Sequence, residues 1–220
     1  MPYLQIKNCS TTKEIGTYPQ TRGVPRGYTF KWFDQEDSMT NLENDTFPKV
    51  IPDLTFEIDD KGKLTDVISP SNLSARGFLF NEQVRKIFNS FHLPNHKIYN
   101  ALMKHKSEIL NYFWLHPVKS DLIGVDFKKS KFIITNFAFI EQSEIDITSE
   151  EDYFKKLSAL SFKHIRVKQL VLTEAFQRET YDLFFFPYIH SYFFISERMA
   201  KSIKESKVSG FSIKEQNIIS

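Results

Sequence analysis

The sequence predicts an α+β protein with a mixed or mainly antiparallel sheet and about three helices. Short runs of alternating apolar residues are spread along the 220-residue chain, and the apolar period becomes helical after residues that can cap a helix. With 22 Phe, 9 Tyr and 2 Trp, the core should consist largely of aromatic rings, each of which removes about 150–250 Å² from water when buried.

Residues 1–50 are polar and rich in Gly and Pro, which is typical of short strands and loops. Within them, Tyr28, Phe30 and Trp32 alternate as one face of a strand would. We therefore expect residues 1–50 to wrap around a main α+β domain formed by residues 51–220 as one compact unit.

A hairpin is predicted at the start of the main domain. Leu54, Phe56 and Ile58 alternate as in a strand, and the turn sequence Asp-Asp-Lys-Gly follows at residues 59–62. The returning strand is expected to begin near Leu64.

The first helix is predicted to begin after Asn81, a suitable N-cap. Apolar residues follow at i, i+3, i+4 and i+7, and Pro94 should end the helix; these residues are Val84, Ile87, Phe88 and Phe91. A less regular pattern suggests another helix over residues 97–107.

Strands are predicted over residues 112–116, 123–127 and 132–140, and over residues 169–173 and 181–186. Between these groups, Ser149 and Asp152 have the spacing of a capping box, in which Ser149 accepts from the Asp152 amide and Asp152 reaches back. The buried face of the helix that follows should consist of Tyr153, Phe154, Leu157 and Leu160.

The longest apolar run covers residues 183–195, and a charged helix is predicted to begin after it, at Ser196. A membrane span needs about 20 apolar residues, so this run predicts buried strands. Met199, Ile203 and Val208 should face inward, and Gly210 should be the residue after the helix end. Residues 78–84 show the same order of residue types as residues 193–199. A shared strand–cap–helix junction is the simpler explanation, and internal duplication is the alternative.

Charge and cysteine content restrict the partners. The 29 Lys and Arg nearly balance the 27 Asp and Glu, which leaves no strong field for nucleic acid or an anionic membrane. One cysteine, Cys9, rules out an internal disulfide and a Cys-rich zinc site. The first residues lack the basic and apolar regions of a signal peptide. We expect a cytoplasmic protein with neither a nucleic-acid nor a membrane partner.

Residues for catalysis are not evident. His92 and His96 are four residues apart, but Pro94 lies between them and breaks the helix that two ligands would share. The paired carboxylates at residues 59–60 and 150–152 fit a turn and the first turn of a helix. A nucleophile elbow, a P-loop and a dinucleotide fingerprint are missing. We expect no enzyme, and no catalytic, cofactor or metal residues.

Several stretches, taken in order, carry a resemblance to a known family: Leu64 to Ser69, Gly77 to Phe80, Leu93 to Tyr99, Val125 to Phe132, Asp182 to Phe184, Ile195 to Arg198, and Ser209 to Phe211. Over about residues 50–215 they resemble a family of immunity proteins from bacterial polymorphic-toxin systems. Ser209-Gly210 stands where the family favours Thr-Gly, and Asn81 where it more often has Ser; both changes keep the physical role.

The resemblance implies a protein that binds and neutralises a cognate toxin domain without catalysis. It assigns no binding residue, because toxin-facing surfaces are expected to vary between members. The net charge of +2 argues against a strongly basic nuclease as the toxin. Two alternatives stay open: a general interaction module with another protein partner, and an enzyme whose cleft includes His190, Tyr188 and Asp182.

Overall fold

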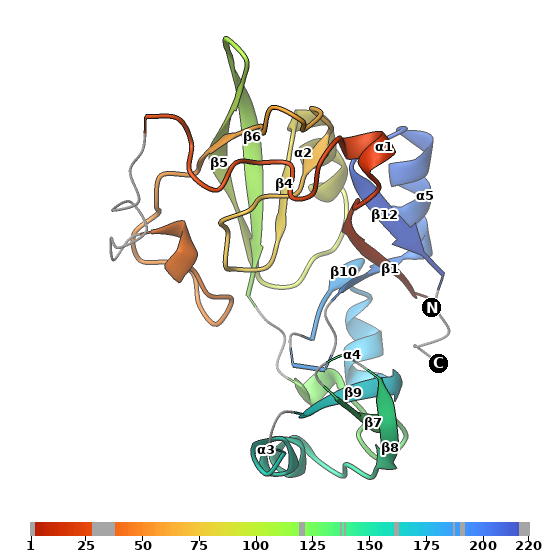
Figure 1. Cartoon of the computed structure of the whole chain (residues 1–220). Helices are drawn as coiled ribbons and strands as arrows, with labels where there is room; N and C mark the ends of the chain where they lie inside the picture. The colour runs from red at the N-terminus through yellow and green to blue at the C-terminus, as the bar shows by residue number, and fades with distance from the viewer. Residues whose placement is uncertain are drawn as a thin grey trace.

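The computed structural model describes residues 3–27, 38–118, 122–136, 138, 140–160, 163–186, 188–189 and 192–215, and its fold is α+β, as predicted (Figure 1). The predicted strand with Tyr28, Phe30 and Trp32 lies outside these residues. The helices are α1 (Thr12–Ile15), α2 (Glu82–Phe88), α3 (Glu150–Ser158), α4 (Glu174–Glu179) and α5 (Glu197–Glu205), with 3-10 turns η2 (Met39–Asn41) and η3 (Leu122–Gly124). The three longest, α2, α3 and α5, begin at the predicted caps Asn81, Ser149 and Ser196.

The strands form three sheets with the orders β2-β5-β6-β4-β3, β10-β11-β1-β12 and β8-β7-β9. Neighbouring strands are antiparallel except for β2 and β5, which are parallel. The strands are β1 (Tyr3–Asn8), β2 (Thr55–Glu57), β3 (Val67–Ile68), β4 (Phe78–Phe80), β5 (His96–His105), β6 (Glu108–Pro117), β7 (Lys131–Asn136), β8 (Glu141–Ile145), β9 (Lys163–Gln169), β10 (Leu183–Phe184), β11 (Phe193–Ser196) and β12 (Phe211–Lys214).

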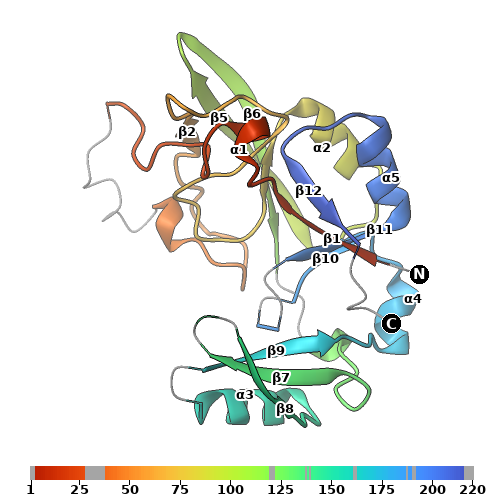
Figure 2. The ribbon, with the colours of Figure 1, turned by 45° about the vertical axis from the view of Figure 1, so that its right-hand side comes forward.

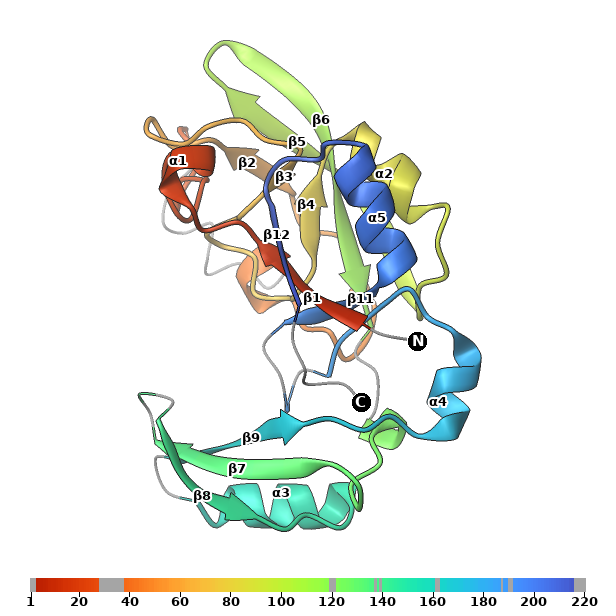
Figure 3. The ribbon, with the colours of Figure 1, turned by 90° about the vertical axis from the view of Figure 1, so that its right-hand side faces the viewer.

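In the four-stranded sheet, β10, β11 and the first half of β1 are buried on both faces, whereas β12 is half-buried. Along its strands, alternate side chains enter two different cores, as the period of two in a strand requires. Ile6, Leu183, Phe185, Phe193 and Ile195 join a core with α2 and α5, whereas Tyr3, Phe184, Phe186 and Phe194 join a core with α3, β7 and β9. Figures 2 and 3 show this sheet between the two helices above and the three-stranded sheet below. The apolar character of residues 183–186 and 193–195 therefore reflects burial on both sides.

The first of these cores is also bounded by the five-stranded sheet. Phe78, Phe80, Phe113 and Leu115 enter it, while their neighbours Leu79 and Trp114 enter a third core on the far face of that sheet. The molecule is thus layered, with apolar side chains on both faces of two sheets.

Two parts of the chain have the same architecture. The succession β3-β4-α2-β5-β6 corresponds to β10-β11-α5-β12 together with β1, and the strand orders β3-β4-β6-β5 and β10-β11-β1-β12 match neighbour by neighbour. In the second unit the strand that corresponds to β6 is β1, which comes from the N-terminus. The N-terminal segment therefore begins with a central strand of the four-stranded sheet. This likeness exceeds what a shared strand–cap–helix junction requires, and it favours duplication.

A hydrogen-bonded carboxylate begins each unit, half-buried at Asp66 and fully buried at Asp182. Asp66 precedes β3 and Asp182 precedes β10, and their backbone oxygens accept from the amides of the helix caps Asn81 and Ser196, both at 2.9 Å. Their side chains bind the same caps: Asn81 Nδ2 donates to Asp66 Oδ1 at 2.7 Å, and Ser196 Oγ donates to Asp182 Oδ1 at 2.5 Å.

The second oxygen of each carboxylate binds the other unit. Asp66 Oδ2 accepts from the amide and hydroxyl of Ser209, which follows α5, at 2.8 and 2.6 Å. Asp182 Oδ2 accepts from the amide of His92, which follows α2, at 2.9 Å. Arg198 also binds both oxygens of Asp182. The two carboxylates therefore link the units reciprocally.

Both carboxylates are held in their ionised form. Burial acts to raise the pKa of Asp66, but the hydrogen bonds from Ser209 and Asn81 outweigh it and keep the pKa below its usual range. Burial acts likewise on Asp182, where hydrogen bonds from Arg198, Ser196 and His92 lower the pKa.

The predicted helix over residues 97–107 is wrong, because this segment is strand β5. Ten residue pairs join β5 to β6, and alternate residues such as Ala101 and Met103 are buried while Leu102 is exposed. Local helix propensity is here overridden by pairing with a long neighbouring strand.

The predicted hairpin with Leu64 is also wrong. The turn after β2 exists, but β2 pairs in parallel with β5, and Leu64 is exposed outside any strand. The predicted strands over residues 123–127 and 169–173 do not form: Val125 and Leu172 make an isolated bridge, and Gln169 is the last residue of β9, which lies earlier than predicted. The predicted strand over residues 132–140 ends at Asn136.

Two helix details differ from the prediction. Ser149 accepts from the Asp152 amide as predicted, but Asp152 reaches back to the Thr148 amide, and Phe154 is 36% exposed. Helix α5 ends earlier than predicted, and Lys207, with φ of 52°, takes the left-handed position expected of Gly210.

Replacing Asp182 with Ala should lower the free energy of unfolding by about 3 kcal/mol, because the amide of His92, the buried hydroxyl of Ser196 and the guanidinium of Arg198 lose their acceptor. Urea unfolding measures this loss. In the parent chain the stabilisation is complete above about pH 5 and declines as the pH falls below about 4, since the folded pKa of Asp182 lies under the unfolded value of about 3.9. An Asp182→Asn variant with an undiminished acid dependence would contradict this account.

Gly210→Ala should be much more destabilising than Gly27→Ala, although both glycines have φ of 90°. A Cβ at Gly210 would lie 2.0 Å from the backbone oxygen of Val67, whereas nothing lies within 4 Å of one at Gly27. Gly27→Ala should cost about 1–2 kcal/mol, the backbone strain alone. Thermal unfolding of the two variants gives the comparison, and equal losses would contradict the close approach.

Candidate functional site

A groove of about 430 Å³ lies where the two units meet, and it is partly open to solvent. Its residues come from β1 and the segment after it, from the connection between β3 and β4, and from the start of β11. They are Ile6, Lys7, Asn8, Ser10, Tyr18, Pro70, Leu73, Ser74, Ala75, Arg76, Gly77, Phe78, Tyr192 and Phe193. A volume of this size is within the range of small-ligand sites.

Three core residues, Ile6, Phe78 and Phe193, contribute the apolar part of the groove, and all three belong to the core between the two sheets. Gly77 lines the groove where the chain runs against β6, because a Cβ there would lie 2.0 Å from the backbone oxygen of Leu115. This part of the site is therefore rigid and set by the fold.

The other wall is the loop of residues 70–77, which the N-terminal segment holds from outside. Ser71 Oγ donates to the backbone oxygen of Arg22 at 2.7 Å, and the Ser71 amide donates to Thr21 Oγ1 at 2.9 Å. Ser74 Oγ donates to the backbone oxygen of Thr40. These contacts tie the loop at two places to residues 1–50.

Asn44 makes a third attachment. Its Nδ2 donates to the backbone oxygens of Arg76 and Pro117 at 2.8 and 2.9 Å, and its Oδ1 accepts from the Arg76 amide at 2.6 Å. The N-terminal segment thus positions the wall of the groove as well as covering the main body.

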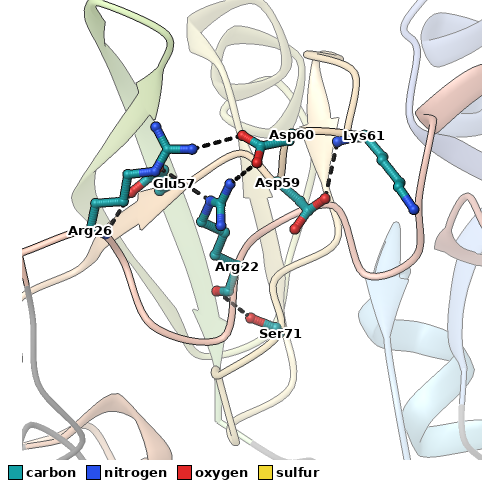
Figure 4. Close-up of polar contacts among 7 residues, drawn as sticks. All are labelled: Arg22, Arg26, Glu57, Asp59, Asp60, Lys61 and Ser71. Carbon is teal, nitrogen blue, oxygen red and sulfur yellow. Dashed lines mark hydrogen bonds and ion pairs between the residues drawn. The ribbon is translucent and has the colours of Figure 1, made fainter.

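An ion-pair network joins the N-terminal segment to β2 and the turn that follows it (Figure 4). Arg22 and Arg26 both bind Asp60, and the Arg26–Asp60 distance is 2.8 Å. Both guanidinium groups also lie within 3.3 Å of the Glu57 carboxylate. The hydrogen bond from Arg22 lowers the pKa of Asp60, and the same bond raises the pKa of Arg22. Two cations and two anions compensate one another here, so this network is suited to anchoring the segment rather than to proton transfer.

The groove itself carries positive charge. Lys7 and Arg76 line it, and none of the lining residues that the structure describes is acidic. Lys7 Nζ lies 5.3 Å from the ring centroid of Tyr192. Burial lowers the pKa of the Arg76 guanidinium.

One buried polar atom at this site is unsatisfied. Asn8 Oδ1 is buried, and the described residues offer it no hydrogen-bond partner. Most buried polar atoms in folded proteins have a partner, so this acceptor is an exception to the usual pattern.

Two of the three residues of the enzyme alternative lie in the described part of the chain, and each packs against neighbouring residues. Asp182 is fully buried in its ion pair with Arg198. Tyr188 is 44% exposed and packs edge-to-face on Phe154 at 5.0 Å, away from the lining of the groove. His190 lies outside the described residues.

The histidines and the cysteine also have structural surroundings. His92 packs on Tyr181 at 4.8 Å, and His96 Nδ1 lies 2.7 Å from the backbone oxygen of Pro94. Buried Cys9 has its thiol 3.4 Å from the Glu14 carboxylate. Within the described part of the chain, no three His, Cys, Asp or Glu residues are grouped as a metal site would need.

Comparison with known proteins gave no family model and no curated protein that matches this chain. Among the described residues, no helix has both the length and the apolar character needed to cross a membrane.

Sequence reasoning did not identify the groove. Lys7 and Arg76 are far apart in the chain, and neither belongs to a motif. The signal that was present lies in the loop sequence Ser-Asn-Leu-Ser-Ala-Arg-Gly at residues 71–77, whose small and polar residues fit a loop that is hydrogen-bonded on one side and lines a groove on the other.

Asn44→Ala should loosen the loop of residues 70–77 and lower the free energy of unfolding by about 1–3 kcal/mol, because the Arg76 backbone loses its partners. Hydrogen exchange at the Arg76 amide should accelerate, while exchange in β7 and β9 should be unchanged. Asn72→Ala, on the same loop, is the matched control. Equal exchange in both variants would contradict the clamp.

Proposed function

We propose that this protein is an immunity protein that binds and neutralises a cognate toxin domain by occlusion, without catalysis. The observation that carries the proposal is the resemblance of residues 50–215 to immunity proteins of polymorphic-toxin systems. The cationic groove, which is open to solvent and built by three separate parts of the chain, supports a binding role.

Residues that carry the resemblance make contacts that hold the fold together. Asp66 binds Asn81 and Ser209, and Asp182 binds Ser196 and Arg198. Gly77 and Gly210 stand where a Cβ would meet a backbone oxygen at 2.0 Å. Residues of this kind preserve a scaffold, and a scaffold shared by a family leaves its outer surface free to differ between partners.

Co-expression with the toxin domain encoded by a neighbouring gene tests the function. Growth of a bacterial host should be restored by this chain, and the purified proteins should form a stoichiometric complex. Because binding is non-catalytic, neutralisation should require at least one equivalent of this chain. Asp182→Ala, which weakens the fold, should rescue growth less well at raised temperature.

Failure of the folded, abundant chain to restore growth would contradict the immunity function. Neutralisation by far less than one equivalent would instead support the enzyme alternative. A stable complex with a non-toxic neighbouring protein would support the general interaction module.

A further inference from the structure

We propose that residues 43–47 form an acid-sensitive latch. They close over the His116 ring while its imidazole is neutral. A proton taken up from solvent at His116 Nδ1 releases them, together with the Arg76 end of the loop of residues 70–77. The latch is independent of the proposed function, because no partner takes part in it.

The His116 ring is fully buried, and the latch supplies part of its cover. His116 Nε2 lies 3.0 Å from the backbone oxygen of Glu43, and the Phe47 ring meets the His116 ring edge-to-face with centroids 5.9 Å apart. On β6 itself, the Trp114 ring stacks on His116 at 4.6 Å. A carbonyl oxygen only accepts, so Nε2 carries the hydrogen of the neutral ring and Nδ1 is a bare acceptor.

The position that a proton would take is enclosed. His116 Nδ1 is buried and has no hydrogen-bond partner among the described residues. In the closed latch a proton there would make a buried charge whose N–H has no acceptor, which is far more costly than a neutral acceptor without a donor. Because water reaches Nδ1 only after the latch moves, proton uptake and opening are coupled.

The cations near His116 also disfavour a proton in the closed latch. Lys97 is the partner of His116 across the β5–β6 pairing, and its ammonium lies 4.5 Å from the centroid of the Phe47 ring. On the loop of residues 70–77 the ionisable residue is Arg76, which is also a cation. A second positive charge nearby opposes formation of an imidazolium.

Other neighbours do not reverse this preference. The Tyr99 ring, whose centroid is 6.2 Å from that of His116, brings a neutral hydroxyl. Glu43 and Asp45 are exposed, so water screens the attraction of their carboxylates for a charged ring. Stacking on Trp114 favours a cation, but by less than burial of the charge costs. Burial accordingly lowers the pKa of His116, although the hydrogen bond to Glu43 acts to raise it.

Asn44, in the middle of the latch, connects it to the groove. The Asn44 side chain binds the backbone amide and oxygen of Arg76 and the backbone oxygen of Pro117. Its chain neighbours, the Glu43 carbonyl and the Phe47 ring, are the groups that contact His116. Release of the latch therefore withdraws Asn44 and frees the Arg76 backbone in the wall of the groove.

The other end of the same loop stays attached. The Ser71 amide donates to Thr21 Oγ1 at 2.9 Å, and neither residue belongs to the latch. The Ser71 and Arg76 amides therefore distinguish release of the latch from general loosening of the loop.

Acid favours the open latch. The exposed ring has the ordinary histidine pKa of about 6.5, and the closed ring has a lower one. The latch is therefore fully stable above about pH 6.5 and opens increasingly as the pH falls toward the pKa of the closed ring. Between these two pKa values the opening equilibrium changes about tenfold per pH unit, because one proton is taken up on opening.

Hydrogen exchange of the full chain, followed by NMR between about pH 7.5 and 5.5, tests the latch. Protection factors are corrected for the intrinsic pH dependence of exchange. Protection of the Arg76 amide should fall about tenfold from pH 6.5 to 5.5, whereas the Ser71 amide and the amides of β7 and β9 should keep theirs. This window lies above the pH at which the stabilisation from Asp182 declines.

Two variants and a direct titration locate the effect. His116→Gln removes the titrating group and keeps an N–H for the Glu43 oxygen, so protection of the Arg76 amide should no longer depend on pH. His105→Gln, the same change at the end of β5, should leave the dependence intact. In the parent chain, NMR titration of the His116 ring should give a midpoint below about 6.5.

Constant protection of the Arg76 amide across the window would overturn the latch, as would an equal acid loss in His116→Gln. Equal losses at Arg76 and in β7 and β9 would indicate global unfolding and would overturn it too. A His116 ring that titrates at or above the ordinary histidine pKa would contradict the enclosed Nδ1. If His116→Gln does not fold, the ring titration and the exchange of the parent chain decide the question. Rescue of growth by co-expression is a separate measurement, so failure of the latch leaves the immunity function standing.

Discussion

Burial of β10 and β11 on both faces is the constraint on which the rest of the structure depends. Phe184 and Phe194 enter one core while Phe185 and Phe193 enter the other, so neither strand has a face left for solvent, whereas β12 is only half-buried. The helices α2 and α5 must then cover one side and the three-stranded sheet the other. Because β1 comes from the N-terminus and lies between β11 and β12, the two ends of the chain are held in the same sheet.

Two carboxylates connect this sheet to its counterpart in the other unit. Asp66 and Asp182 each bind the cap of their own helix and the segment that leaves the other helix. Buried charges are costly unless they are paired and hydrogen-bonded, and here each one receives several donors. The reciprocal arrangement sets the distance between the units, and the groove lies along their junction. Its wall is then positioned by Thr21, Thr40 and Asn44 from the N-terminal segment.

Local chemistry made part of this fold predictable. The caps at Asn81, Ser149 and Ser196 were right because a side chain that accepts from an amide three residues later is a local interaction. The strand β5 was missed because its conformation depends on pairing with β6, and the parallel pairing of β2 with β5 has no local signal. The groove was missed for the same reason, since Lys7, Asn8 and Arg76 meet only in the folded molecule. The likeness of residues 78–84 and 193–199 was visible, but its extent became clear only from the matching strand orders.

We propose that a rigid scaffold, with strands β10 and β11 buried on both faces, presents its solvent-open groove to the toxin domain. Hydrogen exchange of the chain alone and in complex with the neighbouring toxin domain measures this most directly, because it reports the contact surface without any substitution. The account predicts new protection concentrated in the segment after β1, in residues 70–77 and around Tyr192. Protection confined to another surface, such as the exposed pair Phe154 and Tyr188 beside α3, with the groove unchanged, would contradict it.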